Sequence, residues 1–159
     1  MPCLLATVAL GGCSATRDAG STGTQNATVT RVVDGDTIKV RVGGRTERVR
    51  YIGVDTPETV KPNSPVECFG RAASDFNKQL VAGEAVTLSY DAEQRDRYGR
   101  LLAYVRRARD GVFVNEQLLQ RGYATTLTIP PNVRYAARFR SVQRDAREAG
   151  RGLWGSCER

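Results

Sequence analysis

The sequence of 159 residues contains no histidine. This absence excludes catalytic triads and zinc sites that rely on imidazole, and it removes the usual general base at neutral pH. Any hydrolytic chemistry must therefore use carboxylates, metal-bound water, or tyrosine and arginine side chains. Lysine is also rare: it occurs only at positions 39, 61 and 78, so arginine carries nearly all of the positive charge.

The chain has a formal net charge of +7, from 24 basic and 17 acidic residues. A positive balance attracts polyanionic partners over long distances, and the planar guanidinium of arginine can bind a phosphate through two hydrogen bonds. An arginine-rich surface that faces only solvent has the same composition, so charge alone leaves both interpretations open. The length suits one globular domain with a tail.

The amino terminus carries a short apolar run at residues 3–10, which is too short to span a bilayer and suits the core of a signal peptide. The following Leu10-Gly11-Gly12-Cys13 resembles a bacterial lipobox. We therefore predict a signal peptide at residues 1–12, a lipid on Cys13 and a flexible tether at 13–26. Such a protein is exported, either as a cell-envelope lipoprotein held to the membrane only by that lipid or as a secreted protein. No basic residue precedes the run, so an apolar leader without an export role is the alternative.

Two further cysteines, Cys68 and Cys157, lie within the part of the chain that is expected to fold. In an exported protein, two well-separated cysteines are a natural disulfide pair, and this bridge would tie the carboxyl terminus to the middle of the chain. Two unrelated buried thiols are the alternative. The sequence has no Cys-x-x-Cys pair, which argues against a structural zinc site.

Hydrophobic periodicity predicts the secondary structure. Alternating apolar and polar residues indicate strands at residues 28–33, 38–42, 46–54, 86–90 and 101–107, with a further short strand at 112–114. Apolar residues at helical spacing indicate three helices, at 69–80, 115–121 and 133–149. Five short strands, with a helix between the third and the fourth, are typical of a small closed barrel. We predict an α+β fold, mainly β, with a five-stranded OB-fold barrel and three helices over residues 27–157.

Two short acidic segments stand out in this basic chain, Asp34-Gly35-Asp36-Thr37 and Val54-Asp55-Thr56-Pro57-Glu58. Asp36 begins one predicted strand and Asp55 ends its hairpin partner, so the Gly43-Gly44 turn would bring both to the same end of the sheet. Paired carboxylates there would form an oxygen-rich site suited to Ca²⁺ or Mg²⁺. Alternatively, Asp-Gly is ordinary turn chemistry and the second segment is a loop or a helix cap.

Three motifs in this order carry a resemblance: the first acidic segment, Arg50-Tyr51-Ile52-Gly53 continuing into the second, and Asp96-Arg97-Tyr98-Gly99-Arg100. Their sequences and separations resemble the signature of the staphylococcal nuclease (thermonuclease) family. The resemblance extends over about residues 27–155, with further matches at Val114-Asn115-Glu116, Gly122-Tyr123-Ala124 and Gly152-Leu153-Trp154. It implies a calcium-dependent phosphodiesterase on an OB barrel.

The resemblance also implies a role for each matching residue. The expected Ca²⁺ ligands are the carboxylates of Asp36 and Asp55 and the backbone carbonyl of Thr56, with Asp34 as an acid beside the metal. The expected catalytic residues are Glu58, as general base toward the attacking water, and Arg50 and Arg100, which would hold the scissile phosphate. Bidentate arginine donors stabilise the extra negative charge of the transition state more than that of the ground state.

The nucleotide subsite is expected to depart from the family pattern. Arg97 and Tyr98 match residues near the nucleotide, although Arg97 replaces the usual lysine and Tyr98 could instead be a loop aromatic that packs on the barrel. Leu127 and Ile129 stand near two positions where the family has tyrosines that contact the nucleotide. This loses aromatic stacking worth roughly 1–3 kcal/mol per base.

The expected substrates are DNA and RNA, cleaved with little sequence preference to leave 3′-phosphate ends, by a monomer. A binding module without catalysis is one alternative, because OB folds often bind single strands. A structural surface lipoprotein whose motifs are relics is the other. The complete set of matching carboxylates and arginines favours the enzyme.

Overall fold

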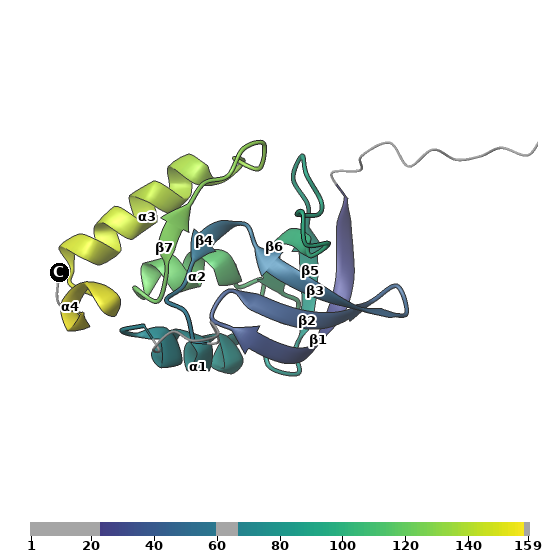
Figure 1. The fold of residues 1–159 in the computed structure, drawn as a ribbon, viewed down its shortest axis with the longest axis horizontal. Coiled ribbons are helices and arrows are strands. Elements are labelled where there is room, and N and C mark those ends of the chain that lie inside the picture. The colour runs from purple at the N-terminus through teal and green to yellow at the C-terminus, as the bar shows by residue number, and fades with distance from the viewer. Residues whose placement is uncertain (1–22, 60–66, 158–159) are drawn as a thin grey trace, which may run out of the picture.

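The computed structural model describes residues 23–59 and 67–157 (Figure 1). The predicted signal peptide and the predicted lipidation site Cys13 lie outside these residues. Strand β1 begins at Thr24, so the last residues of the predicted tether belong to the barrel instead. Within the two described ranges, no helix is both long and apolar enough to cross a membrane.

Five strands close into a barrel in the order β1-β2-β3-β6-β5. They are β1 (Thr24–Asp34), β2 (Thr37–Val42), β3 (Arg45–Tyr51), β5 (Ala85–Ser89) and β6 (Leu101–Arg107). Neighbouring strands are antiparallel except for β3 and β6, which are parallel. The predicted five-stranded OB-fold barrel is confirmed.

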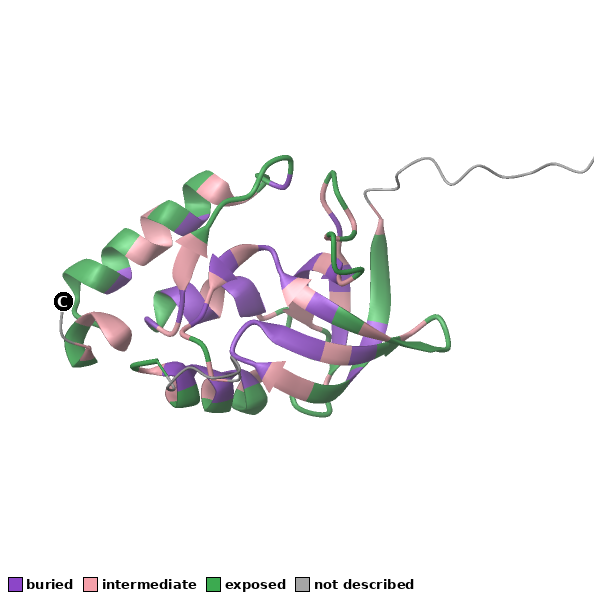
Figure 2. Ribbon diagram, in the orientation of Figure 1, coloured by how far each residue is buried: buried purple, intermediate pink, exposed green. Residues whose placement is uncertain are grey.

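Alternate side chains of each strand fill the interior of the barrel. In β2, Ile38 and Val40 are fully buried, whereas Lys39 between them is only partly covered and Arg41 is exposed. Figure 2 shows the same alternation of buried and exposed positions along the barrel strands. The period of two that predicted these strands therefore separates the core from the outer face.

The predicted strand at 46–54 is in fact two strands, because the chain turns away from the barrel after Tyr51. Gly53 has a φ of 79°, and a Cβ there would lie 2.7 Å from the ring of Phe139, so only glycine fits this bend. Strand β4 (Gly53–Asp55) then pairs with β7 (Thr125–Leu127), a strand that was not predicted.

The helices lie outside the barrel, away from the tip of the β2–β3 hairpin (Figure 1). They are α1 (Gly70–Val81), α2 (Val114–Gln120), α3 (Ala136–Glu148) and the short α4 (Leu153–Ser156). The three predicted helices are present, α3 starts later than expected, and α4 is additional. The strand predicted at 112–114 is wrong, because Val114 already begins α2 and Phe113 makes only an isolated bridge with Arg106.

A disulfide joins Cys68, just before α1, to Cys157, just after α4. This is the pair expected from the sequence. The bridge links the segment that precedes α1 to the end of the chain, 89 residues later. The start of the first helix and the end of the last helix are therefore linked covalently.

Candidate active site

Two parts of the chain meet at one end of the barrel. The first is the tight turn between β1 and β2, which carries Asp34 and Asp36. The second is the segment that leaves the barrel as β4, ends in Asp55 and continues through Thr56 to Glu58. Because β2 and β3 form a hairpin, its open end brings the turn and the departing segment together, as the sequence predicted.

Asp36 is buried and joins the two parts directly. Its Oδ2 atom accepts hydrogen bonds from the backbone N–H of Thr56 at 2.9 Å and from the Thr56 hydroxyl at 3.0 Å. Its Oδ1 atom accepts a bond from the Thr37 hydroxyl at 3.0 Å. These hydrogen bonds fix the orientation of the Asp36 carboxylate and the position of Thr56.

The guanidinium of Arg50 lies between the carboxylates of the two parts. Its Nη2 atom is 2.7 Å from Oδ1 of Asp55 and 3.2 Å from Oδ2 of Asp36. Its Nη1 atom donates to the carbonyl oxygens of Val54 at 2.7 Å and Tyr51 at 3.0 Å. Arg50 is thus largely buried, with 14% of its side chain exposed, and the planar fork is held in one orientation.

Asp34 binds protein groups around the turn. Its Oδ1 atom accepts hydrogen bonds from the backbone N–H of Gly35 at 2.8 Å and from the Thr59 hydroxyl at 2.7 Å. Its carbonyl oxygen accepts a bond from Asn77 of α1 at 3.0 Å, and Asn77 in turn accepts one from the buried hydroxyl of Tyr51. Asp34 therefore anchors the acidic turn to α1 and to the segment after Glu58.

Negative charge is concentrated around Asp55 and Glu58. Burial raises the pKa of Asp55, and the charges of Asp36 and Glu67 add to this rise, so that together they outweigh the opposing effect of Arg50. Burial also raises the pKa of Glu58, and four neighbouring carboxylates raise it further. Asp55 and Glu58 are therefore both harder to ionise than free carboxyl groups, first because they are partly buried and then because like charges lie near them.

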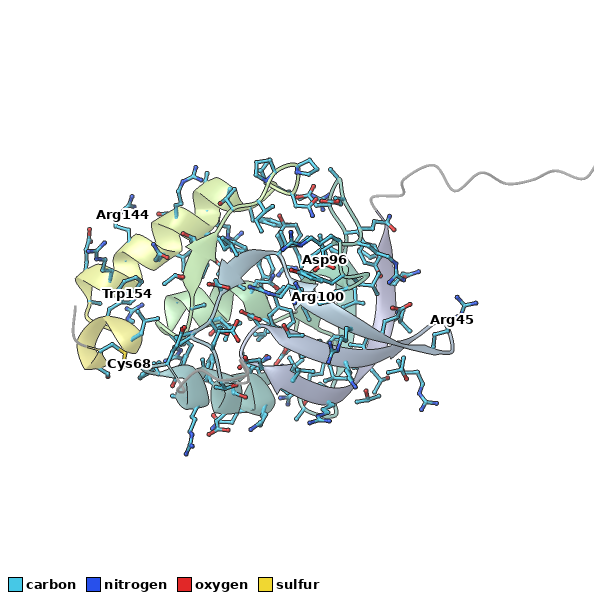
Figure 3. The ribbon with its side chains drawn as sticks, in the orientation of Figure 1. Arg45, Cys68, Asp96, Arg100, Arg144 and Trp154 are labelled. Atoms are coloured by element: carbon cyan, nitrogen blue, oxygen red, sulfur yellow. A yellow bond between two sulfur atoms is a disulfide. The ribbon has the colours of Figure 1, made fainter. Side chains whose placement is uncertain are left out.

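A second guanidinium, that of Arg100, is held in place by Asp96 (Figure 3). The Nε atom of Arg100 donates to Asp96 Oδ2 at 2.7 Å, and the backbone N–H groups of Arg100 and Tyr98 donate to Asp96 Oδ1 at 3.0 and 2.9 Å. Arg97 and Arg100 both lie over the ring of Tyr98, and Arg97 donates a hydrogen bond to its hydroxyl at 2.6 Å. Tyr98 remains 67% exposed, so it is not a loop aromatic packed into the barrel.

A cleft of about 440 Å³ connects the two arginines. Its lining includes Arg50, Gly53 and Val54 of β4, and the loop residues Arg97, Tyr98 and Arg100. Leu127 and Ile129, the residues at the expected tyrosine positions, also line it, with exposures of 39% and 61%. Arg50 and Arg100 therefore line one cleft, and part of its wall is aliphatic.

The acidic end of the barrel fits a hard divalent cation by its chemistry. Its donors are carboxylate and carbonyl oxygens, the ligands that Ca²⁺ prefers. Burial and neighbouring carboxylates raise the pKa values of Asp55 and Glu58, and a bound cation would favour the ionised form of both groups. In residues 23–59 and 67–157, however, no three acidic or cysteine side chains are arranged as a ready metal-binding cluster.

The sequence identified most of these residues and missed several supporting ones. Predicted residues from the two acidic segments lie together around Arg50, and the predicted Arg97, Tyr98 and Arg100 line the same cleft as Arg50. Reasoning from sequence missed Asn77 and Thr59, which hold Asp34, and Glu67, whose carboxylate accepts the N–H of Glu58 at 3.1 Å. Single polar residues in a helix or a loop carry no local pattern that would identify them.

Comparison with known proteins decides the family. Residues 48–156 match the family model described as staphylococcal nuclease homologue. The chain belongs to the staphylococcal nuclease family. It is 43% identical to a thermonuclease of Staphylococcus hyicus over 132 residues, which cover 83% of this chain and 77% of the relative.

Two more relatives of the staphylococcal nuclease family support this assignment. A thermonuclease of Staphylococcus intermedius is 47% identical over 126 residues, covering 79% of this chain and 74% of its own. The endonuclease YncB of Bacillus subtilis is 45% identical over 131 residues, covering 81% of this chain and 61% of its own. The matched region of the family model contains Arg50, Asp55, Glu58 and Arg100, whereas the turn with Asp34 and Asp36 precedes it.

Proposed function

We propose that this protein is an exported, Ca²⁺-dependent nuclease that hydrolyses DNA and RNA with little sequence preference and leaves 3′-phosphate ends. Membership of a nuclease family, with relatives named thermonuclease and endonuclease, makes the chain a hydrolase of nucleic acids. The observation that carries the finer proposal is the pair of fixed guanidinium groups, Arg50 and Arg100, that face one cleft beside a cluster of carboxylates.

In the proposed mechanism, a phosphodiester lies in the cleft between the two arginines. Glu58 accepts the proton of the attacking water while the water oxygen forms a bond to phosphorus. The bond from phosphorus to the 5′-oxygen then breaks, and the departing oxygen takes a proton from solvent. The phosphate stays on the 3′-oxygen of the other fragment.

Arg50 and Arg100 supply the stabilisation of the transition state. Attack by water adds negative charge to the equatorial oxygens of phosphorus, and fixed donors interact more strongly with that charge than with the ground state. The contacts of Arg50 with two carbonyl oxygens and of Arg100 with Asp96 hold the guanidinium groups before substrate binds. Little reorganisation is then needed during the reaction.

Asp36, Asp55 and the carbonyl of Thr56 are the proposed Ca²⁺ ligands, with Asp34 in support. Bound Ca²⁺ would neutralise phosphate charge and act as a Lewis acid. Low sequence preference follows because arginine and carboxylate groups interact with phosphate and water, whereas sequence is recognised through base edges. The proposed export rests on the predicted signal peptide at residues 1–12 and on Cys13 after it. Lipidation of Cys13 and a monomeric state are part of the same proposal.

The first prediction tests catalysis and its dependence on calcium. The wild-type protein should cleave single-stranded DNA and RNA in Ca²⁺ and lose this activity in excess chelator. Glu58→Gln should lower kcat by about 10²–10⁴-fold, because it removes the general base and keeps the side-chain shape. End-group analysis of the products should find phosphate on the 3′ side.

Glu148→Gln is the matched control, because Glu148 is an exposed residue at the end of α3 and outside the cleft. It should retain wild-type activity. Binding of DNA without cleavage in Ca²⁺ would favour a non-catalytic binding module. Full activity of Glu58→Gln, or cleavage that is insensitive to chelator, would contradict the proposed mechanism.

A further inference from the structure

Three basic side chains form a row across the outer face of the barrel. Arg31 of β1 pairs in register with Lys39 of β2, and Lys39 pairs in register with Arg48 of β3. Residues directly opposite each other on neighbouring strands point to the same face, with Cβ atoms roughly 5 Å apart. The three cations therefore follow one line perpendicular to the strands. We call Arg31, Lys39 and Arg48 the basic row.

The basic row faces solvent without compensating charges. Arg31 and Arg48 are exposed, and Lys39 is partly covered. No ion pair within the described part of the chain includes any of the three. Like charges directly across two strands destabilise a sheet. Three aligned cations that have no acidic partner among the described residues suit a polyanion, whose evenly spaced charges they can neutralise.

The row continues into the proposed active site. Arg48 and Arg50 are two residues apart on β3, so their side chains point to the same face of the sheet. Arg48 also lines a second, shallower cleft of about 480 Å³ together with Tyr98, Gly99 and Arg100. Tyr98 and Arg100 line both this cleft and the cleft that contains Arg50. Arg48, at one end of the basic row, and the proposed catalytic arginines therefore border adjoining clefts.

We propose that the basic row binds the phosphate backbone of a single-stranded polynucleotide on one side of the scissile bond, away from the reacting phosphate. This inference rests on the proposed nuclease function and extends it: it assigns substrate length dependence to residues outside the catalytic site. Each cation contacts one phosphate of the strand, which crosses β3, β2 and β1 in turn. Tyr98, which is exposed and lines both clefts, lies at their junction.

A polynucleotide fits this surface better than an anionic membrane does. A planar bilayer could meet the exposed row but could not follow it into the two clefts that Tyr98 and Arg100 share. A flexible single strand can cross the row and enter the cleft with the same backbone. OB folds contact roughly 4–16 nucleotides of a single strand, which is enough to cover the row and the catalytic cleft together.

The second prediction compares the variant Arg31→Gln/Lys39→Gln/Arg48→Gln with the wild-type protein. In chelator, its affinity for an oligothymidylate of about 12 nucleotides should fall on the order of 10- to 100-fold near physiological salt. The slope of log K against log salt should become shallower by about 2, since each phosphate contact with a single strand contributes about 0.7. In Ca²⁺, the KM for the oligomer should rise, while kcat/KM for a thymidine dinucleotide should stay at the wild-type value.

The matched control is Arg71→Gln/Arg121→Gln/Arg140→Gln, which removes the same charge from three exposed arginines on the helical side. It should change affinity and salt slope much less than the row variant. Equal losses of affinity in the two variants would overturn the binding role of the basic row, because net charge alone would then explain binding. A wild-type protein that binds no oligonucleotide in chelator but cleaves it in Ca²⁺ would overturn the row alone, whereas one that neither binds nor cleaves it in Ca²⁺ would overturn both the row and the proposed function.

Two further measurements separate this role from alternatives. Thermal unfolding at low salt should show that Lys39→Gln is more stable than wild type, because it relieves repulsion from both neighbours. Loss of oligomer binding in the row variant together with a raised Tm supports a binding role and excludes misfolding as the cause. Retained oligomer binding with lost binding to phosphatidylserine vesicles would assign the row to a lipid surface and overturn the proposal.

Discussion

At the scale of single residues, the two proposed catalytic arginines are positioned by different means. Arg50 is fixed by backbone carbonyls and by the acidic cluster itself. Arg100 has one carboxylate partner, Asp96, which also accepts two backbone N–H groups of the same loop. Asp96 therefore sets both the conformation of the loop and the direction of the Arg100 guanidinium.

The third prediction concerns Asp96 as a positioning residue. Asp96→Ala should lower kcat by about 10²-fold, since a displacement of about 1 Å of a catalytic group can have that effect. Asp96→Glu should recover part of the rate because a carboxylate remains to hold Arg100. Steady-state kinetics on the oligomer should show the loss in kcat, with the affinity for Ca²⁺ unchanged.

The control is Asp110→Ala, which breaks a comparable ion pair with Arg107 in an exposed turn away from the cleft. It should leave kcat at the wild-type value. If Asp96→Ala and Asp110→Ala reduced kcat equally, the loss would come from general destabilisation, and the positioning role of Asp96 would be wrong.

The charge state of Asp96 also gives a pH dependence of stability. Burial alone would raise the pKa of Asp96, but the hydrogen bonds and charge of Arg100, with the N–H of Tyr98, lower it overall. A lowered folded-state pKa contributes stability above the unfolded-state value of about 3.9, and this stability is lost as the pH falls through the folded-state pKa. Asp96→Asn should therefore reduce the free energy of unfolding at neutral pH and differ less from wild type at about pH 3.

At the scale of elements, the site depends on close contact between the β1–β2 turn and the segment after β4. A Cβ at Gly35 would lie 2.6 Å from the hydroxyl oxygen of Thr56 and 2.8 Å from its Cβ. Only glycine lets the acidic turn approach Thr56 closely enough for the two hydrogen bonds to Asp36. The glycine of the first acidic motif therefore has a packing role and does not act only as a turn former.

The fourth prediction is that Gly35→Ala weakens calcium binding and also lowers stability. The methyl group should displace Thr56 and raise the Ca²⁺ concentration for half-maximal activity by roughly 10-fold or more. Overpacking should also lower the free energy of unfolding by about 1–3 kcal/mol. Calcium titrations of activity and denaturant unfolding measure the two effects.

Gly43→Ala is the control for this substitution. Gly43 has a φ of 55°, and no atom lies within 4 Å of the place that a methyl group would take, so alanine there strains only the hairpin backbone. It should lower the free energy of unfolding by about 1–2 kcal/mol without changing the calcium titration. An unchanged calcium titration in Gly35→Ala would show that Thr56 does not take part in the site.

Elements with strong local patterns could be predicted from the sequence, and those defined by tertiary contacts could not. Strand β2 alternates, and its burial follows that alternation. Strand β7 has only three residues and exists because it pairs with β4, so its formation depends on a distant segment. The bend at Gly53 depends equally on the ring of Phe139 in α3. No window of sequence contains these partners together.

The same distinction between local patterns and tertiary contacts applies to the candidate site. The two acidic motifs indicated a cation site because carboxylates are conspicuous in a basic chain. The supporting amides were not predictable: Asn115, for example, accepts a hydrogen bond from Val105 and donates to the carbonyl of Ile52, linking α2, β6 and the segment between β3 and β4. An asparagine in a short helix has many possible roles, and only the folded chain selects this one.

At the scale of the whole molecule, the disulfide connects the proposed site to the end of the chain. Cys68 follows Glu67, whose carboxylate accepts the backbone N–H of Glu58. Cys157 directly follows α4 and shares a surface recess with Asp55 and Thr56. The bridge therefore links the segment next to the proposed general base to the terminal helices. The hydrogen bond between Asp34 and Thr59 links the same segment to the barrel.

The fifth prediction is that Cys68→Ala/Cys157→Ala lowers the free energy of unfolding by about 2–5 kcal/mol, because an unfolded chain without the bridge gains the conformational freedom of a loop closed over 89 residues. Denaturant unfolding should give this loss, and the reduced wild-type protein should unfold at the same denaturant concentration as the double variant. Cys157→Ala alone should match both, since either change opens the same loop. If the double variant were as stable as the oxidised wild type, the barrel and helices would hold the terminus without the bridge, and the disulfide would have no part in keeping the segment before α1 against the site.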